Sequence, residues 1–345
     1  MKKTLLMIVA ALVVASPMVD AQNKIDKQGR RQGHWMRTDK DGAKIFEGTF
    51  KDGLETGVFT YYYHDGNVRM RNTYIVPGKV CRHEAFDEQG HLLADGYYNQ
   101  RNRDSIWHFY ATDGRLVKQA AYRMGVKHGQ HIVFNQTGDT AEVATWSDNR
   151  RHGRWWKRIG KNGYITATYI KGGIEGRLVE YDEHNKLTRE GFYEDGYKHG
   201  SYRYYENGDL TIDEQWQHGM MLDRRIRLLL PEAEFVSIHD IVCIVPQGKN
   251  RVIFYLSDGS KKVSRENPDL VFERIGNELF ATANSKSRIV VATHNVQGLG
   301  ADNEGREILL LDPQPDINIY PDEDGLKMVQ SRSYEDSSPL DQLTR

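Results

Sequence analysis

Three histidines recur with fixed neighbours: His128, His152 and His199 each follow a lysine or arginine and precede a glycine. Imidazole nitrogens bind transition metals and titrate near neutral pH, so adjacent members such as His128 and His152 could share a metal ion or sense pH. Glu175 takes the place of a histidine in this series, and no cysteine or carboxylate accompanies the three histidines. The sequence therefore favours a simpler interpretation, in which Lys/Arg-His-Gly is the turn formula of a repeat, and it predicts no metal site.

Two short segments are rich in oxygen ligands, namely Asp-Asn-Glu-Gly at residues 302–305 and Asp-Glu-Asp-Gly at residues 322–325. Oxygen ligands suit calcium, but neither segment has the full spacing of a calcium-binding loop. Aspartate and asparagine side chains also close turns by bonding to their own backbone. We interpret both segments as turns.

Sequence motifs typical of enzymes are missing: the chain has no Gly-x-Ser-x-Gly, no His-Glu-x-x-His, no phosphate loop and no Cys-x-x-Cys. We therefore expect a non-catalytic protein with no catalytic residues, no metal and no cofactor. The alternative is an enzyme whose site lies in the C-terminal part of the chain and follows none of these patterns.

A basic and aromatic stretch covers residues 149–161, and no acidic residue occurs between Asp148 and Glu175. Arginine pairs with carboxylates or phosphates, and tryptophan supplies large contact areas, so this mixture is typical of a binding hot spot. The alternative is a solvated strand whose tryptophans belong to a structural column, as we expect for Trp155 but not for Trp156. The predicted partner-binding residues are Arg150, Arg151, Arg154, Trp156, Lys157 and Arg158.

An internal repeat of about 24 residues must position these side chains, and it is the strongest signal in the sequence. One aromatic residue closes each of eight units. These structural aromatics are Phe50, Tyr74, Tyr98, Tyr122, Trp146, Tyr169, Tyr193 and Trp216.

Glycines form further columns in the same register. One comprises Gly33, Gly57, Gly129, Gly153, Gly176 and Gly200, with Cys81 and Ser105 in the two remaining places. Pairs such as Asp41-Gly42 and Asn207-Gly208 are typical of hairpin turns, which require positive φ angles. Each unit therefore predicts one β-hairpin, and stacking of aromatic columns between successive hairpins must supply the stability. Arg101 and Pro77 depart from the glycine pattern, so we expect irregularity there.

Segments such as residues 192–208 and 121–129 resemble MORN repeats, and more closely the MORN-variant repeats of bacterial proteins often labelled antitoxin-like, the YwqK type. The resemblance covers residues 29–219. It implies a β-meander platform for protein or lipid contacts.

The N-terminus has the order of a secretory signal peptide: Lys2 and Lys3, an apolar run from Leu5 to Ala15, and a small-residue site before Gln22. We expect an exported protein, periplasmic, surface-bound or secreted, with no transmembrane segment after cleavage. Cys81 and Cys243 could form a disulfide in such a compartment, but two widely spaced cysteines make no framework, and buried free thiols are favoured.

The formal net charge of the chain is only -1. No overall field favours nucleic acid, so we expect no nucleic-acid partner. The expected partner is an unidentified protein, for example an envelope component. The alternative function is a lipid- or glycan-binding surface.

The period ends near Leu228, and apolar, β-branched runs follow that favour a small β-rich domain. Runs such as Ile241–Val245 and Ile308–Leu311 are apolar on both faces, which predicts strands buried in a core. This domain could cap the last hairpin or bind independently. The predicted organisation is therefore all-β, with an extended antiparallel meander of about eight hairpins. Its parts are a signal peptide (1–21), an N-terminal segment (22–28), the repeat array (29–219), a linker (220–233), the C-terminal domain (234–331) and a disordered tail (332–345).

Overall fold

The computed structural model describes residues 23–229, 234–276 and 279–335. The chain divides into two compact units, with the boundary between Arg150 and Arg151. Strands take up 62% of the chain and helices 7%, so the predicted all-β class is confirmed. The predicted signal peptide at 1–21 lies outside the described residues, as do residues 336–345 of the predicted tail.

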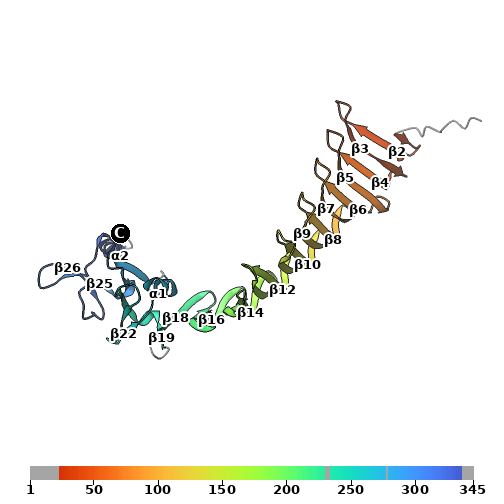
Figure 1. Cartoon of the computed structure of the whole chain (residues 1–345). Helices are drawn as coiled ribbons and strands as arrows, with labels where there is room; N and C mark the ends of the chain where they lie inside the picture. The colour runs from red at the N-terminus through yellow and green to blue at the C-terminus, as the bar shows by residue number, and fades with distance from the viewer. Residues whose placement is uncertain (1–22, 230–233, 277–278, 336–345) are drawn as a thin grey trace, which may run out of the picture. The chain divides into compact units, whose positions relative to one another are not determined.

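The first unit is an antiparallel meander in which each strand from β2 to β11 pairs with the next along the chain (Figure 1). A short first strand pairs with β2. The strands are β1 (Lys24–Ile25), β2 (Arg31–Thr38), β3 (Lys44–Lys51), β4 (Leu54–Tyr62), β5 (Val68–Val76), β6 (Val80–Phe86), β7 (Leu92–Asn99), β8 (Asn102–Tyr110), β9 (Leu116–Arg123), β10 (Val126–Phe134) and β11 (Thr140–Ser147).

The second unit continues the repeat and then changes character. Its meander strands pair antiparallel in sequence order. They are β12 (Arg150–Ile159), β13 (Gly163–Ile170), β14 (Gly173–Tyr181), β15 (Leu187–Glu194), β16 (Tyr197–Glu206), β17 (Asp209–Gln217), β18 (Met220–Leu228) and β19 (Glu234–Ser237).

Two kinds of turn join the strands. Two-residue turns with positive φ at both positions follow β3 (Asp52 53°, Gly53 83°) and recur at the same end of most later hairpins, including the Gln100-Arg101 turn at 49° and 67°. Arg101 therefore keeps the regular turn, whereas the segment around Pro77 is longer by one residue. At Asp41-Gly42 the loop has three residues, and only the glycine has positive φ. The Asp39 carboxylate accepts hydrogen bonds from the backbone N–H groups of residues 41 and 43.

The glycine column that begins at Gly33 marks β-bulges rather than turns. Gly57 has a φ of 65°, and the register of β3 against β4 shifts beside it, from Glu47 opposite Thr60 to Thr49 opposite Thr56. Ser105 holds the same place with a φ of 61°. Bulges of this kind increase the local twist of a strand.

One face of each meander carries a column of large side chains, one per hairpin. In the first unit the column comprises Trp35, Phe59, His83, Trp107 and His131; in the second it comprises Trp155, Leu178 and Tyr202. The predicted aromatics alternate with this column: the Phe50 ring is 5.8 Å from Trp35 and 5.0 Å from Phe59, both edge-on. Edge-to-face rings at such distances add stabilisation beyond the burial of area.

Small residues lie opposite the column because the rings cover them. A Cβ atom at Gly96 would be 2.4 Å from the Trp107 ring, and one at Gly191 would be 2.0 Å from the Tyr202 ring. These glycines supply space for a ring, whereas the turn glycines supply backbone freedom.

The rest of the second unit is a five-stranded antiparallel sheet in the order β22-β21-β20-β24-β23, with a hairpin of β25 and β26 and two helices. The elements are η1 (Ile238–Asp240), β20 (Ile241–Pro246), β21 (Val252–Leu256), β22 (Lys261–Ser264), α1 (Pro268–Ile275), β23 (Phe280–Asn284), β24 (Ile289–Ala292), η2 (Thr293–Asn295), β25 (Val296–Ala301), β26 (Glu307–Leu311) and α2 (Glu323–Glu335).

This sheet has a core on each face. Ile244 and Phe254 belong to one core, which also takes in Val271 of α1 and Ile226 of β18. Cys243 and Tyr255 belong to the other, with Leu309 of β26. Both faces of β20 are therefore buried, as its continuous apolar run predicts; in β26, by contrast, Leu310 is exposed.

Three boundaries differ from those predicted. Residues 220–228 form β18 instead of a linker, because β18 pairs with β17 and its Ile226 and Leu228 enter the C-terminal core. Helix α2 continues to Glu335, past the predicted start of the tail at 332. Helix α1 was missed, although Asn267 and Pro268 form a recognisable helix start.

Candidate interaction surface

The predicted partner-binding residues occupy β12, where alternation sends neighbours to opposite faces. Trp155 faces the column, with its ring 5.9 Å from that of Tyr169 and edge-on to it. The Arg151 guanidinium lies 5.7 Å from the Trp155 ring and 5.3 Å from the Tyr169 ring, so this arginine belongs to the structural face. Arg150 is exposed at the start of the strand, and Lys157 is exposed on the side of Trp155.

Trp156 lies on the opposite face and begins a row of stacked rings. Its ring centroid is 6.2 Å from that of Tyr164, and the Tyr164 centroid is 5.0 Å from that of Tyr181. The planes are tilted by only 27° and 26°. All three side chains are half-buried, so their ring faces and edges are partly accessible. Tyr164 and Tyr181 were not among the predicted binding residues.

This aromatic row departs from the repeat at two places together. The column that contains Trp156 holds no other tryptophan, tyrosine or phenylalanine: its members are Met36, Thr60, Glu84, His108, Ile132, Trp156, Val179 and Arg203. The column that contains Tyr164 likewise has no second aromatic: its members are Lys44, Val68, Leu92, Leu116, Thr140, Tyr164, Leu187 and Leu210. Comparison of repeat columns, position by position, could have found this pair from the sequence.

Arg158 also departs from its column. Tyr62, Tyr110 and Tyr205 hold the same place in other hairpins, and each donates a hydrogen bond to a carboxylate of the preceding strand. Burial first, and then the bond to Glu47, raises the pKa of Tyr62 to about 12. The Arg158 guanidinium instead lies 5.9 Å from the Trp156 ring and donates to the Lys161 carbonyl at 3.1 Å.

The structure thus brings Trp156 and Arg158 together on one face, with Arg154 exposed on the same face by alternation. It separates them from Arg151 and Lys157. Flat rings beside guanidinium groups can bind a surface that offers carboxylates and apolar groups. We refer to Arg154, Trp156, Arg158, Tyr164 and Tyr181 as the aromatic patch.

A second candidate, a polar cavity of about 430 Å³, lies between the last hairpins and α1. Its deepest charge is Glu214, which is 1% exposed and bonds Arg224 at 2.8 Å and the Trp216 indole at 2.8 Å. Each arginine that lines it pairs with a carboxylate of the protein: Arg189 with Glu180, Arg224 with Glu214, and Arg274 with Glu266. The cavity arginines are therefore committed to structural pairs.

The remaining sequence candidates are accounted for by local structure. The Asp302 carboxylate accepts backbone bonds from residues 304 and 306; partial burial opposes ionisation, yet these bonds lower the pKa of Asp302 to about 2. The Asp322 carboxylate is held in a similar way by Ser285. Residues 302–305 form a turn, as predicted, whereas residues 322–325 do not: Asp322 accepts from the backbone N–H groups of residues 324 and 325 at the start of helix α2.

Cys81 and Cys243 are buried free thiols. Burial raises the pKa of the Cys243 thiol to about 12 and also raises that of Cys81, so neither is activated as a nucleophile.

Within residues 23–229, 234–276 and 279–335, no helix is long and apolar enough to cross a membrane. No family model and no curated protein matches the sequence.

Proposed function

We propose that this chain is an exported, non-catalytic repeat scaffold that binds a protein partner through the aromatic patch. The observation that carries the proposal is the row formed by Trp156, Tyr164 and Tyr181 with Arg158 over its first ring. Both aromatic departures from the repeat fall on this face, although the structural column on the other face already stabilises the hairpins.

The partner we infer has an acidic surface with exposed apolar groups. No acidic residue lies between Asp148 and Glu175, so the strand that carries Trp156 presents only positive charge over that stretch. Residues 1–21 support export, and the resemblance to MORN-variant repeats supports a β platform that makes contacts. An envelope protein fits both expectations.

Affinity capture from an envelope fraction, followed by crosslinking, tests the proposal. A variant with Arg154, Trp156 and Arg158 replaced by Ala should lose the captured protein, with binding weakened about 30-fold or more, because a hot spot contributes about 2 kcal/mol or more. Arg203→Ala, in the same repeat column as Trp156, serves as the matched control and should leave binding unchanged.

Folding must be checked in the same variants. Trp155→Ala should lower the melting temperature, because that indole belongs to the structural column, whereas the patch variant should melt close to the wild type. Equal capture by the patch variant and the wild type would refute the proposal, and retention of lipid or glycan in place of a protein would redirect it.

A further inference from the structure

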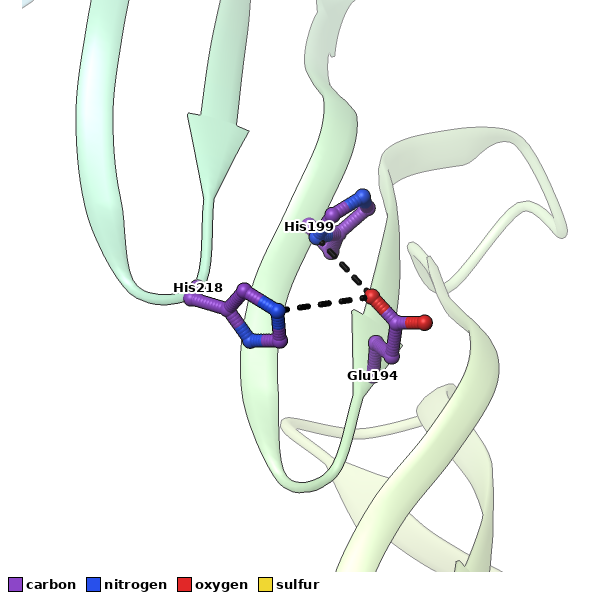
Figure 2. A group of neighbouring side chains, drawn as sticks. All are labelled: Glu194, His199 and His218. Atoms are coloured by element: carbon purple, nitrogen blue, oxygen red, sulfur yellow. Dashed lines mark ion pairs between the residues drawn. The ribbon is translucent and has the colours of Figure 1, made fainter.

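Three side chains that can ligate a metal meet at the turns of the last hairpins (Figure 2). Glu194 ends β15, His199 lies near the start of β16, and His218 is the first residue of the turn between β17 and β18. The Glu194 Oε2 atom is 3.1 Å from His199 Nδ1 and 3.9 Å from His218 Nε2. No other group of three such residues occurs within the described parts of the chain.

Backbone geometry brings the three together. His218 and Gly219 have φ angles of 44° and 82°, which fold the turn tightly. The Gly219 N–H donates to the Lys198 carbonyl at 2.9 Å, so the turn is fixed beside His199. The imidazole centroids of His199 and His218 are 5.3 Å apart, with their planes at 73°.

Three other hairpins use the position of His199 differently. There the side chain caps the first N–H of the next turn: Gln32 accepts from Asp52 at 3.0 Å, Asp104 from Met124 at 3.0 Å, and Glu175 from Asp195 at 3.0 Å. His199 makes no such cap to His218. Its Nδ1 atom is buried and, although close to the Glu194 carboxylate, forms no aligned hydrogen bond.

The equivalent place in the first unit already contains a cation. Arg123, His128 and Asp148 hold the three corresponding positions there, and the Arg123 guanidinium is 3.5 Å from the Asp148 carboxylate. His128 Nδ1 is 3.9 Å from the same oxygen. In the second unit the arginine is replaced by Glu194 and the aspartate by His218, so three electron-pair donors face one another without the arginine.

We propose that Glu194, His199 and His218 bind a divalent transition metal ion, and that Zn²⁺ fits this ligand set best. Zinc takes nitrogen and carboxylate ligands at about 2.0–2.2 Å, which places tetrahedral ligands about 3.3 Å apart. The two distances from Glu194 lie on either side of that value, and all three ligand atoms lie within 4.8 Å of one another. Small side-chain rotations complete the site.

Such an ion would join two hairpins and leave a coordination position open. Glu194 and His199 belong to the β15–β16 hairpin, and His218 belongs to the β17–β18 hairpin. The metal would stabilise their stacking, and the fourth position would take water or a ligand from outside. The histidine spacing alone did not predict this site, because Glu194 and His218 lie outside the Lys/Arg-His-Gly column.

Isothermal titration of the purified, metal-free protein with Zn²⁺ tests the inference, and Co²⁺ provides an absorption signature for the ligand set. We expect one high-affinity site per chain and the visible bands of a four- or five-coordinate Co²⁺ complex. His218→Ala and Glu194→Gln should each weaken binding at least tenfold and change the Co²⁺ spectrum. Both residues are exposed, so these variants should fold normally, which circular dichroism checks.

His128→Ala is the matched control, because His128 holds the same repeat position beside Arg123 and should contribute nothing. Failure of Zn²⁺ to bind, or binding that His218→Ala and Glu194→Gln leave unchanged, would overturn the inference. Equal weakening by His128→Ala would also overturn it. The outcome is independent of the aromatic patch, since no patch residue is altered.

Discussion

The hairpin repeats and the C-terminal region of this protein solve the same packing problem differently. In the repeats, one face is covered by a column of large side chains and by the aromatic residues that alternate with it, and most of these alternating residues are only half-buried. In the C-terminal region, both faces of a five-stranded sheet are covered, and Ile244 and Phe254 have no exposed surface. Each repeat is therefore held by contacts with its neighbours, whereas the C-terminal core depends on all its elements at once.

The largest expected effect is in the C-terminal core. Phe254→Ala should reduce the free energy of unfolding of that region by about 3–5 kcal/mol, because a large buried ring leaves a cavity. Hydrogen exchange should show lost protection throughout β20, β21, β23, β24, α1 and β18, which share the core. Protection lost only beside residue 254 would mean that this core is not cooperative, and the contrast with the repeats would fail.

A smaller and more local effect is expected in the repeats. Gly96→Val should cost about 1–3 kcal/mol, because its Cβ would lie 2.4 Å from the Trp107 ring and force that ring to move. Hydrogen exchange should increase in the hairpins next to β7 and β8 and leave distant repeats protected. Ala121→Val, on the opposite face, is the control and should have little effect. Loss of protection along the whole first unit would contradict nearest-neighbour stabilisation.

Much of this comparison could be predicted from the sequence. The closing aromatic residue recurs in all eight units and the glycine column holds glycine in six of them, so local exceptions do not hide either pattern. The predicted turn dipeptides, such as Asp41-Gly42, did not locate the two-residue turns. Those turns lie at places such as Met124-Gly125, where glycine is the only residue typical of a turn. The bulge role of Gly57 needed the register of the paired strand.

Features without a repeated pattern were harder to predict. The prediction of a linker at 220–233 was wrong for residues 220–228. Strand β18 lacks the aromatic and glycine residues of the repeat but still pairs with β17. His83 and His131 were not recognised as members of the ring column, since histidine is usually exposed. The aromatic patch and the Glu194 site each combine residues from separate columns. Only a position-by-position alignment of the repeats shows that those residues are exceptions.

The two column histidines make the stability of the first unit depend on pH below 6.5. Burial, helped by the charge of Arg103, lowers the pKa of His83, and burial also lowers that of His131. Below pH 6.5 the unfolded chain therefore binds more protons than the folded protein. The stabilisation is complete above that pH and is lost as pH falls from 6.5 through the lowered folded values.

Urea unfolding of the whole protein at several pH values, followed by hydrogen exchange, measures this difference. Acidification should weaken the first unit before the C-terminal region, whose described histidines, His239 and His294, are exposed. His131→Gln removes one titrating group while keeping a donor for the Ala121 carbonyl, and it should flatten the pH profile of the first unit. Parallel weakening of both regions would show that the buried imidazoles are not responsible.

The smallest expected effect is a gain of stability at one turn. Arg101 has a φ of 67° at a position where most other hairpins have glycine, such as Gly53 at 83° and Gly125 at 86°. For a residue other than glycine, this conformation costs about 1–2 kcal/mol in the folded state. Replacement by glycine removes that cost, but about half of the gain is offset because glycine gives the unfolded chain more conformational entropy. Arg101→Gly should therefore raise the free energy of unfolding by up to about 1 kcal/mol, as measured by urea denaturation.

The matched substitution in the C-terminal region should not repeat that gain. Arg288 has a similar φ of 55°, but its guanidinium pairs with Asp269 and lies 5.3 Å from the Phe272 ring, so removing the side chain also removes packing. Arg288→Gly should be neutral or destabilising. If both substitutions stabilise equally, backbone conformation alone decides the outcome. The side chain at such a turn would then contribute nothing in either region, and the distinction between repeated turns and irregular loops would not extend to their energetics.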